Sequence, residues 1–158
     1  MTRSHEYHAR LDWTGAASGP TSSYAGYSRE YRIEIAGKPA LAGSADPMFR
    51  GDPALHNPEE LLVMALSSCH LLSYLARAAR AGVHVVAYAD SAAGTMELAG
   101  GGGRFTEVVL HPVVTIAEGH DAELATRLHE QAHADCFIAA SVNFPVRHEA
   151  ATVTAKKP

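Results

Sequence analysis

A long apolar helix is the feature that most constrains how this chain can fold. From Asn57 to Gly82, apolar residues recur at near-helical spacing and few polar residues interrupt them. Asn57 can cap the helix, Pro58 suits its first position, and Glu60 completes a capping box. A helix this apolar must be covered on most sides, so we expect a sheet that wraps around a central helix.

Strand-like segments lie on both sides of this helix. Strands are expected at 7–13 and 30–35 before it, a loop at 36–56, and strands at 83–88, 95–98, 105–117 and 143–154 after it, with a second helix capped by Asp121 and running to about Asp135. The order β-β-α-β-β-β-α-β predicts an α+β fold with a mostly antiparallel sheet. No linker or repeat divides the chain, so we expect one domain over residues 1–158.

Composition and charge exclude several classes of protein. The chain is 47% apolar and 19% charged, which is typical of globular proteins rather than disordered ones. The net charge is −4 and no run of Lys or Arg is present, so we expect no nucleic-acid partner. The uninterrupted apolar runs fall short of the roughly 20 residues that cross a bilayer, and the first twenty residues lack a signal-like apolar region. We therefore expect a cytoplasmic protein with no membrane partner.

The two cysteines, Cys69 and Cys136, leave three interpretations open. They are buried apolar thiols, metal ligands or redox groups. The metal interpretation rests on His129, His133 and Cys136, which are spaced to share one helical face, with Cys69 or His70 completing a tetrahedral zinc shell. Such spacing is only moderately specific, because the chain has ten histidines.

Two segments resemble the OsmC/Ohr family of thiol-dependent organic hydroperoxide reductases. They are residues 57–70, NPEELLVMALSSCH, and residues 129–136, HEQAHADC, and the likeness is closest to the OsmC-like branch. The resemblance implies an antiparallel sheet around a long central helix in an intertwined homodimer. It also implies reduction of organic hydroperoxides to alcohols, in oxidative-stress defence, through a Cys69 sulfenic acid and a Cys69–Cys136 disulfide. No bound cofactor is implied, since an external dithiol or lipoyl-type donor supplies the electrons.

An arginine and an acid complete the site that this resemblance implies. A cysteine thiol is mostly protonated at neutral pH, and burial raises its pKa further, so a thiolate needs a neighbouring cation. Arg50, on the loop before the helix, matches the family's arginine, and Arg29 is the alternative. Glu59 matches the carboxylate that holds it. Taken without the resemblance, Glu59 is more simply an acid in the first turn of a helix.

The position of Glu59 has a consequence for assembly. Glu59 and Cys69 are ten residues apart on one helix, which corresponds to a rise of about 15 Å. One carboxylate cannot serve a sulfur at that distance, so we expect Glu59 to act on Cys69 of a second subunit in a two-fold homodimer.

The substrate wall is less well determined by the sequence. Phe49, Met64 and Phe137 are candidates for an apolar wall that favours alkyl hydroperoxides, although core packing explains each equally well. The chain departs from many relatives at Phe137, where they have proline, and at His70, where they have an aromatic residue. The alternative functions are a metal- or ligand-binding protein that uses Cys136, His129 and His133 without turnover, and an interaction protein with inert thiols.

Overall fold

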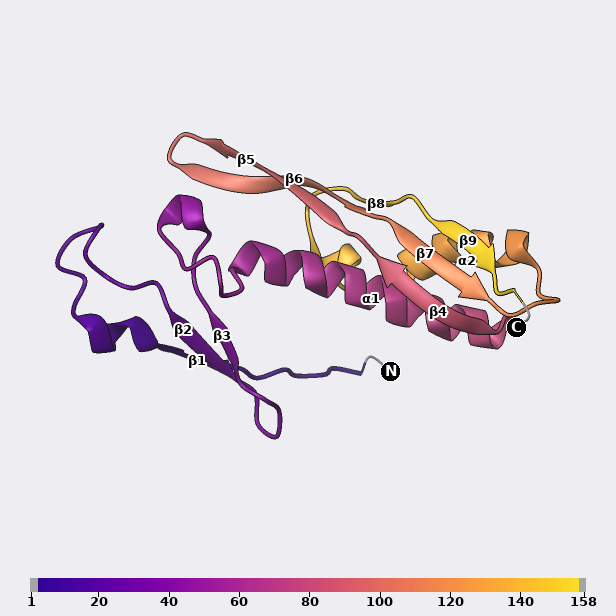
Figure 1. The fold of residues 1–158 in the computed structure, drawn as a ribbon, viewed down its shortest axis with the longest axis horizontal. Coiled ribbons are helices and arrows are strands. Elements are labelled where there is room, and N and C mark those ends of the chain that lie inside the picture. Colours follow the sequence, from indigo (N-terminus) through magenta and orange to yellow (C-terminus); the bar gives the residue numbers. More distant parts are fainter. Residues whose placement is uncertain (1–2, 157–158) are drawn as a thin grey trace. The chain divides into compact units, whose positions relative to one another are not determined.

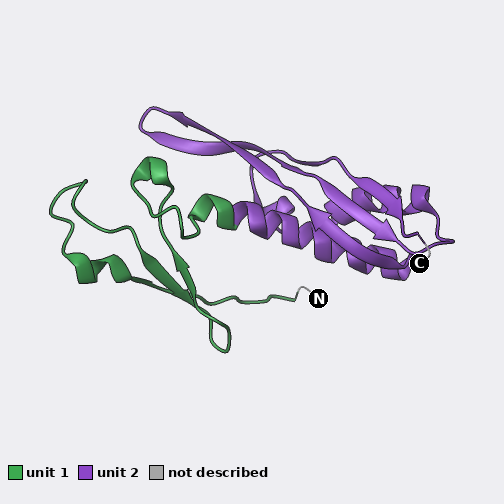
Figure 2. Cartoon of the chain, in the orientation of Figure 1, with its two compact units in different colours: residues 1–61 green, residues 62–158 purple. Residues whose placement is uncertain are grey.

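A computed structural model describes residues 3–156 of the chain. It divides into two compact units, unit 1 up to Leu61 and unit 2 from Leu62 on (Figure 2). The helices and strands of both units are labelled in Figure 1. The prediction of one domain over residues 1–158 stays a prediction.

Unit 1 contains a three-stranded antiparallel sheet and two short 3-10 helices. The elements are β1 (Arg10–Trp13), η1 (Thr14–Ser18), β2 (Tyr31–Glu34), β3 (Leu41–Gly43) and η2 (Pro47–Phe49), and the strand order is β1-β2-β3. The unit ends in the first turn of helix α1 (Pro58–Arg80). The predicted capping box is confirmed there: the Glu60 amide donates to Asn57 Oδ1 at 2.8 Å, and the Asn57 amide donates to Glu60 Oε2 at 3.2 Å.

Unit 2 contains the rest of α1, a second helix and six strands in two sheets. The elements after α1 are β4 (Val85–Asp90), β5 (Ala93–Ala99), β6 (Gly102–Leu110), β7 (Pro112–Ile116), α2 (Ala122–Ala134), η3 (Ala139–Ser141), β8 (Val146–His148) and β9 (Ala151–Thr154). The sheets have the orders β4-β7-β9 and β5-β6-β8 (Figure 1). β4 pairs with β7 and β5 with β6 in antiparallel fashion, whereas β8 and β9 add in parallel to β6 and β7.

Helix α1 is the centre of the larger core of unit 2. Tyr74 and Ala78 of α1 are buried with Val114 and Ile116 of β7 and with Leu128 of α2. By length and composition alone α1 could cross a membrane, with a mean hydropathy of 1.4 over its most apolar window. One face of α1 packs in unit 2, where Leu66, His70, Tyr74 and Ala78 are buried and the Tyr74 hydroxyl donates to the Ala125 carbonyl of α2 at 3.0 Å. The α+β fold with a central helix is confirmed.

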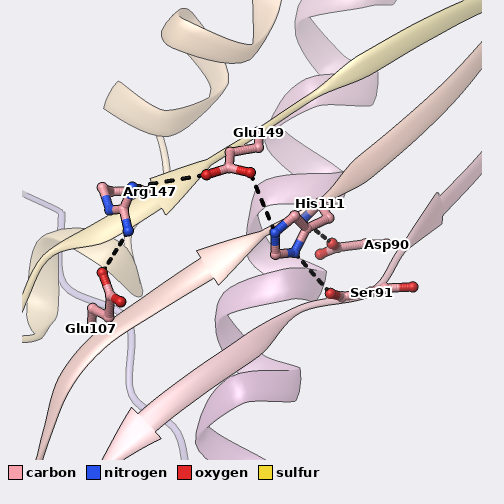
Figure 3. Close-up of polar contacts among 6 residues, drawn as sticks. All are labelled: Asp90, Ser91, Glu107, His111, Arg147 and Glu149. Carbon is pink, nitrogen blue, oxygen red and sulfur yellow. Dashed lines mark hydrogen bonds and ion pairs between the residues drawn. The ribbon is translucent and has the colours of Figure 1, made fainter.

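A polar network ties the strands of unit 2 to one another (Figure 3), and Asp90 also links it to α1. Asp90, at the end of β4, accepts from the Ser67 hydroxyl of α1 at 2.5 Å and from the His111 amide at 2.7 Å. The His111 ring contacts the Ser91 carbonyl at 3.0 Å and Glu149 at 3.6 Å. Asp90 therefore fixes α1 against the sheet at Ser67, which is two residues before Cys69.

A second ion pair continues this network on β8. The Arg147 guanidinium donates to Glu107 of β6 at 2.7 Å and lies 3.9 Å from Glu149 (Figure 3). Both residues of the Arg147–Glu107 pair are partly exposed, so the pair contributes little to the free energy of folding.

Three predictions about strands and loops were wrong in detail. The expected strand 143–154 is two strands, β8 and β9, which join different sheets. The expected strand 105–117 is two strands, β6 and β7, that separate at His111. Pro112 has no amide hydrogen for a ladder and begins a strand instead, and the amide of His111 donates to a side chain. The expected loop 36–56 contains β3, whose three residues pair with β2. The second helix, 122–134, agrees with its prediction.

Candidate functional site

The two cysteines lie side by side in unit 2, although they are 67 positions apart in the sequence. Cys69 is in the middle of α1 and is partly buried, and Cys136 follows α2 and is 2% exposed. Both are free thiols, and their side chains are close enough to hydrogen-bond. The structure therefore brings together the pair of sulfur atoms that the resemblance implies, while their roles in a reaction stay predictions.

The surroundings of Cys136 keep it protonated. Burial, followed by the hydrogen bond to Cys69, raises the pKa of Cys136 to about 11. The backbone amide of Ala139 donates to Cys136 Sγ at 3.4 Å and opposes this increase. Cys136 is therefore the sulfur that stays a thiol near neutral pH, and Cys69 is the more exposed of the two.

An ion pair holds the end of α2 against α1 beside this cysteine pair. Arg77 of α1 donates to Asp135 through Nε at 2.5 Å and through Nη2 at 2.8 Å. The pKa of the Asp135 carboxyl is lowered, chiefly by its hydrogen bond to Arg77. Asp135 caps the C-terminal end of α2 and directly precedes Cys136.

Four histidines gather between α1, α2 and β8; the sequence analysis grouped His70, His129 and His133 as possible zinc ligands and did not include His148. His70 and His129 are fully buried, and His70 Nε2 lies 3.0 Å from His129 Nδ1. The His148 ring centre lies 5.4 Å from that of His70 and 5.9 Å from that of His133. We refer to His70, His129, His133 and His148 as the histidine cluster. His148 could not be predicted to join it, because β8 reaches this position only through its parallel pairing with β6.

Burial keeps the centre of the histidine cluster uncharged. Burial is the largest cause that lowers the pKa of His70 to about 4 and that of His129 to about 3, and neighbouring histidines add to both effects. Burial also lowers the pKa of His148, against the opposing effect of Glu130. Within residues 3–156, His70 Nδ1, His129 Nε2 and His133 Nδ1 are buried without a hydrogen-bond partner. The His70–His129 pair thus behaves as two neutral imidazoles joined by one hydrogen bond.

The metal interpretation receives no support from the side-chain geometry. Across residues 3–156, no group of three or more His, Cys, Asp or Glu side chains is placed to hold one metal ion. His129, one of the three expected ligands, is instead hydrogen-bonded to His70. Its ring stacks on that of Tyr74, with 4.1 Å between the ring centres.

The two candidate arginines lie in unit 1 and differ in their local contacts. The Arg29 guanidinium stacks over the Tyr27 ring, 3.8 Å from its centre, and donates to the carbonyls of Tyr24 and Tyr27. Arg50 is exposed and ends η2 in a left-handed conformation, with φ 68°. Arg50 is the one non-glycine residue with positive φ among residues 3–156, and such strained positions are enriched at functional sites.

Glu59, also in unit 1, has a carboxylate oxygen that lacks a donor. Within the described part of the chain, its Oε2 is buried without a hydrogen-bond partner. Its charge adds to burial in raising the pKa of Tyr31. A buried carboxylate oxygen is costly without a donor, so the surroundings of Glu59 favour the approach of a cationic or N–H group.

The three candidate wall residues are placed differently. Phe49 is partly buried in η2 of unit 1, Met64 is an exposed residue of α1, and Phe137 is 82% exposed directly after Cys136. Phe137 does not pack in the core of unit 2, so core packing no longer explains it.

Comparison with known proteins gives consistent matches. Residues 51–150 match the family model described as OsmC-like protein. An OsmC-like protein of unknown function from Vibrio cholerae is 33% identical, with 93% of this chain and 99% of that chain covered and a TM-score of 0.84. No curated protein matches the chain.

Two structures of hydroperoxide resistance proteins share the fold at lower identity. That from Elizabethkingia anophelis is 18% identical, with 98% of this chain and 100% of that one covered and a TM-score of 0.69. The Legionella pneumophila protein, whose description adds OsmC and predicted redox protein, is 14% identical, with coverage of 96% and 98% and a TM-score of 0.67. At these identities the likeness concerns the fold.

Proposed function

This chain belongs to the OsmC family, which supports a stress-related redox role for it, and we propose that it is a thiol-dependent peroxidase. Its proposed reaction is the reduction of organic hydroperoxides to alcohols. The observation that carries the proposal is the contact between Cys69 and Cys136, a half-buried sulfur beside a buried one. Two structures that share the fold are described as organic hydroperoxide resistance proteins, which agrees with this substrate class.

The proposed reaction has two thiol steps and one external reduction. The Cys69 thiolate attacks the distal peroxide oxygen, so that the S–O bond forms, the O–O bond breaks, and the alkoxide takes a proton to leave as alcohol. Cys136 then loses its proton and attacks the Cys69 sulfur of the sulfenic acid, which releases water and leaves a disulfide. An external dithiol returns both thiols through a mixed disulfide.

Arg50 is the arginine that we assign to the Cys69 thiolate. A guanidinium stays charged when it is desolvated, so it can stabilise the thiolate and polarise the peroxide. Arg29 is already engaged by two carbonyls and a tyrosine ring, whereas Arg50 is exposed in a strained turn. The Glu59 oxygen without a donor is a suitable partner for this guanidinium.

We propose that the active assembly is a two-fold homodimer. Met64, Leu72 and Leu75 fall on one face of α1, spaced to follow one another along the helix, and unit 2 leaves all three exposed. Leu72 is 66% exposed, in the middle of the helix that carries Cys69. A second copy of the chain would cover this apolar face and supply Glu59 to the opposite site.

Replacing Leu72 by glutamate should dissociate this dimer. A charge buried in an apolar interface costs several kcal/mol, which corresponds to a weakening of the dimer by about 100-fold or more. Light scattering during size-exclusion chromatography measures the mass, with Val153→Glu on β9 as a control at another exposed apolar position. A Leu72→Glu chain that keeps the mass of the wild type would exclude this face as the interface.

The pH dependence of disulfide formation provides a further prediction. Since the pKa of Cys136 is about 11, its thiolate is scarce at neutral pH, and the second step should accelerate by about tenfold per pH unit between pH 6 and 9. Stopped-flow mixing of preformed Cys69 sulfenic acid at several pH values measures this slope. A rate independent of pH would show that Cys136 does not have to ionise before it attacks.

Non-reducing peptide mapping tests the proposed function directly. After one equivalent of cumene hydroperoxide, the reduced protein should contain a peptide pair linked through Cys69 and Cys136, and cumyl alcohol should appear in equal amount. If the free thiols of the protein are oxidised no faster than a simple thiol in solution, the proposal is overturned. Elemental analysis of the same sample tests the metal-binding alternative, which requires about one zinc ion per chain.

A further inference from the structure

The Arg77–Asp135 ion pair is placed to control where Cys136 lies. Arg77 is on α1, eight residues beyond Cys69, and its guanidinium binds both carboxylate oxygens of Asp135, at 2.5 and 2.8 Å. A third nitrogen, Nη1, approaches Gln131 Oε1 at 3.4 Å. A two-pronged contact of this kind fixes the orientation of the carboxylate as well as its distance, because both groups are planar.

Asp135 transmits this constraint to Cys136 through the backbone. The Asp135 amide donates to the carbonyls of Gln131 and His133, which closes the last turn of α2, and the Cys136 amide donates to His133. Asp135 and Cys136 are joined by one peptide bond. The carboxylate that Arg77 holds therefore fixes the turn that carries the Cys136 sulfur.

The other polar contacts between α1 and α2 are farther along the chain from Cys136. They are the hydrogen bond between His70 and His129 and the one from Tyr74 to Ala125. These contacts hold the body of α2, and Arg77 makes the polar contact from α1 to its last turn, next to Cys136. The pair is also about one-third exposed at both residues, so its contribution to overall stability is small.

Disulfide formation is sensitive to this placement. The two sulfurs must approach from hydrogen-bonding distance to about 2.05 Å, with a restricted dihedral angle about the new bond. A misplacement of about 1 Å between reacting groups can slow a reaction by about 100-fold. The first step, attack of Cys69 on a peroxide, does not involve Cys136 and has no such requirement.

We infer that Arg77 is a positioning residue for the second thiol step: through Asp135 it holds Cys136 in line with the Cys69 sulfenic acid. The inference rests on the proposed peroxidase function. It separates two groups of residues, those that make the sulfenic acid and those that convert it to the disulfide.

A single-turnover experiment with two readouts tests this role. Reduced protein receives one equivalent of cumene hydroperoxide; a dimedone probe reports Cys69 sulfenic acid, and non-reducing peptide mapping reports the Cys69–Cys136 link. In Arg77→Met, sulfenic acid should form within about twofold of the wild-type rate, while the disulfide should form at least about tenfold more slowly. The exchanged pair Arg77→Asp with Asp135→Arg should recover a large part of the second rate.

The Arg147–Glu107 pair provides a matched control. It is another partly exposed arginine–carboxylate pair in unit 2, on β8 and β6, with a 2.7 Å contact. Arg147→Met should leave both steps unchanged. If Arg77→Met does not fold, Asp135→Asn, which keeps the shape of the side chain, and Arg77→Lys take its place.

The outcomes distinguish this inference from the proposed function. Disulfide formation at the wild-type rate in Arg77→Met or Asp135→Asn would overturn the positioning role, and so would an equal slowing of both steps. A wild-type protein that gives neither sulfenic acid nor a disulfide would instead overturn the peroxidase proposal itself.

Discussion

Replacement of Cys69 by serine will abolish oxidation of the protein by organic hydroperoxides, whereas replacement of Cys136 by serine will stop the reaction at the sulfenic acid. A serine hydroxyl is not ionised near neutral pH, so Cys69→Ser should react at least about a thousandfold more slowly than the wild type. Cys136→Ser retains the attacking sulfur and should consume one equivalent of hydroperoxide at close to the wild-type rate, without forming an intramolecular disulfide.

Mass spectrometry of the intact chain checks both results. Cys136→Ser should gain one oxygen atom, and should gain a dimedone adduct when the probe is present; Cys69→Ser should gain neither. Turnover with a dithiol donor should be lost in Cys69→Ser. If Cys136→Ser forms no sulfenic acid while Cys69→Ser does, the two cysteines have exchanged roles.

The second large effect concerns acid. The pKa values of His70 and His129 are lowered by burial to about 4 and about 3, from 6.5 in an unfolded chain. Between these values and pH 6.5 the unfolded chain binds more protons than the folded one, so the free energy of unfolding falls as the pH falls through this range. Each of the two histidines should make the free energy of unfolding about 2 kcal/mol lower at pH 5 than at pH 8.

Charged neighbours modify this effect without reversing it. Asp90 opposes the lowering of the His70 pKa, while His133 and His148 add to it, and Glu130 acts on His148 in the opposite direction to burial. The Arg77–Asp135 pair contributes in a different range, because the lowered pKa of Asp135 means that its stabilisation is lost only as the pH falls below the ordinary range of a carboxyl.

Urea denaturation followed by circular dichroism at pH 5 and pH 8 measures the difference, at one fixed protein concentration so that assembly contributes equally. The double variant His70→Leu with His129→Phe should lose most of the difference between the two pH values. The exposed His5, changed to alanine, should leave it unchanged. Equal urea midpoints for the wild type at pH 5 and pH 8 would contradict the neutral buried pair.

Local sequence signals were sufficient to predict the helices. The Asn57–Glu60 capping box and the Asp121 cap are both formed by hydrogen bonds within four residues, so their geometry is encoded locally. β3 was missed because three residues carry little periodicity, and the strand exists through its pairing with β2. The division of 105–117 at His111 depends on Asp90, which lies 21 positions earlier.

The site shows the same limit. The proximity of Cys69 and Cys136 followed from a family resemblance and not from their spacing, which permits many arrangements. Arg77 and Asp135 gave no signal in the sequence, because each is an ordinary charged residue near the end of a helix and only the packing of α2 on α1 pairs them. His70 and His129 were considered together only as possible zinc ligands, and nothing in their spacing indicated that they form a buried hydrogen-bonded pair.

The parallel pairing of the last two strands affects the order in which the chain matures during synthesis. β8 and β9 complete their sheets by joining β6 and β7, and in between the chain builds α2 and the turn with Cys136. A nascent chain that has not yet left the ribosome through Thr154 leaves β6 and β7 with open edges, which can recruit other chains. These two edges therefore stay unpaired until β8 and β9 have been synthesised and have joined them.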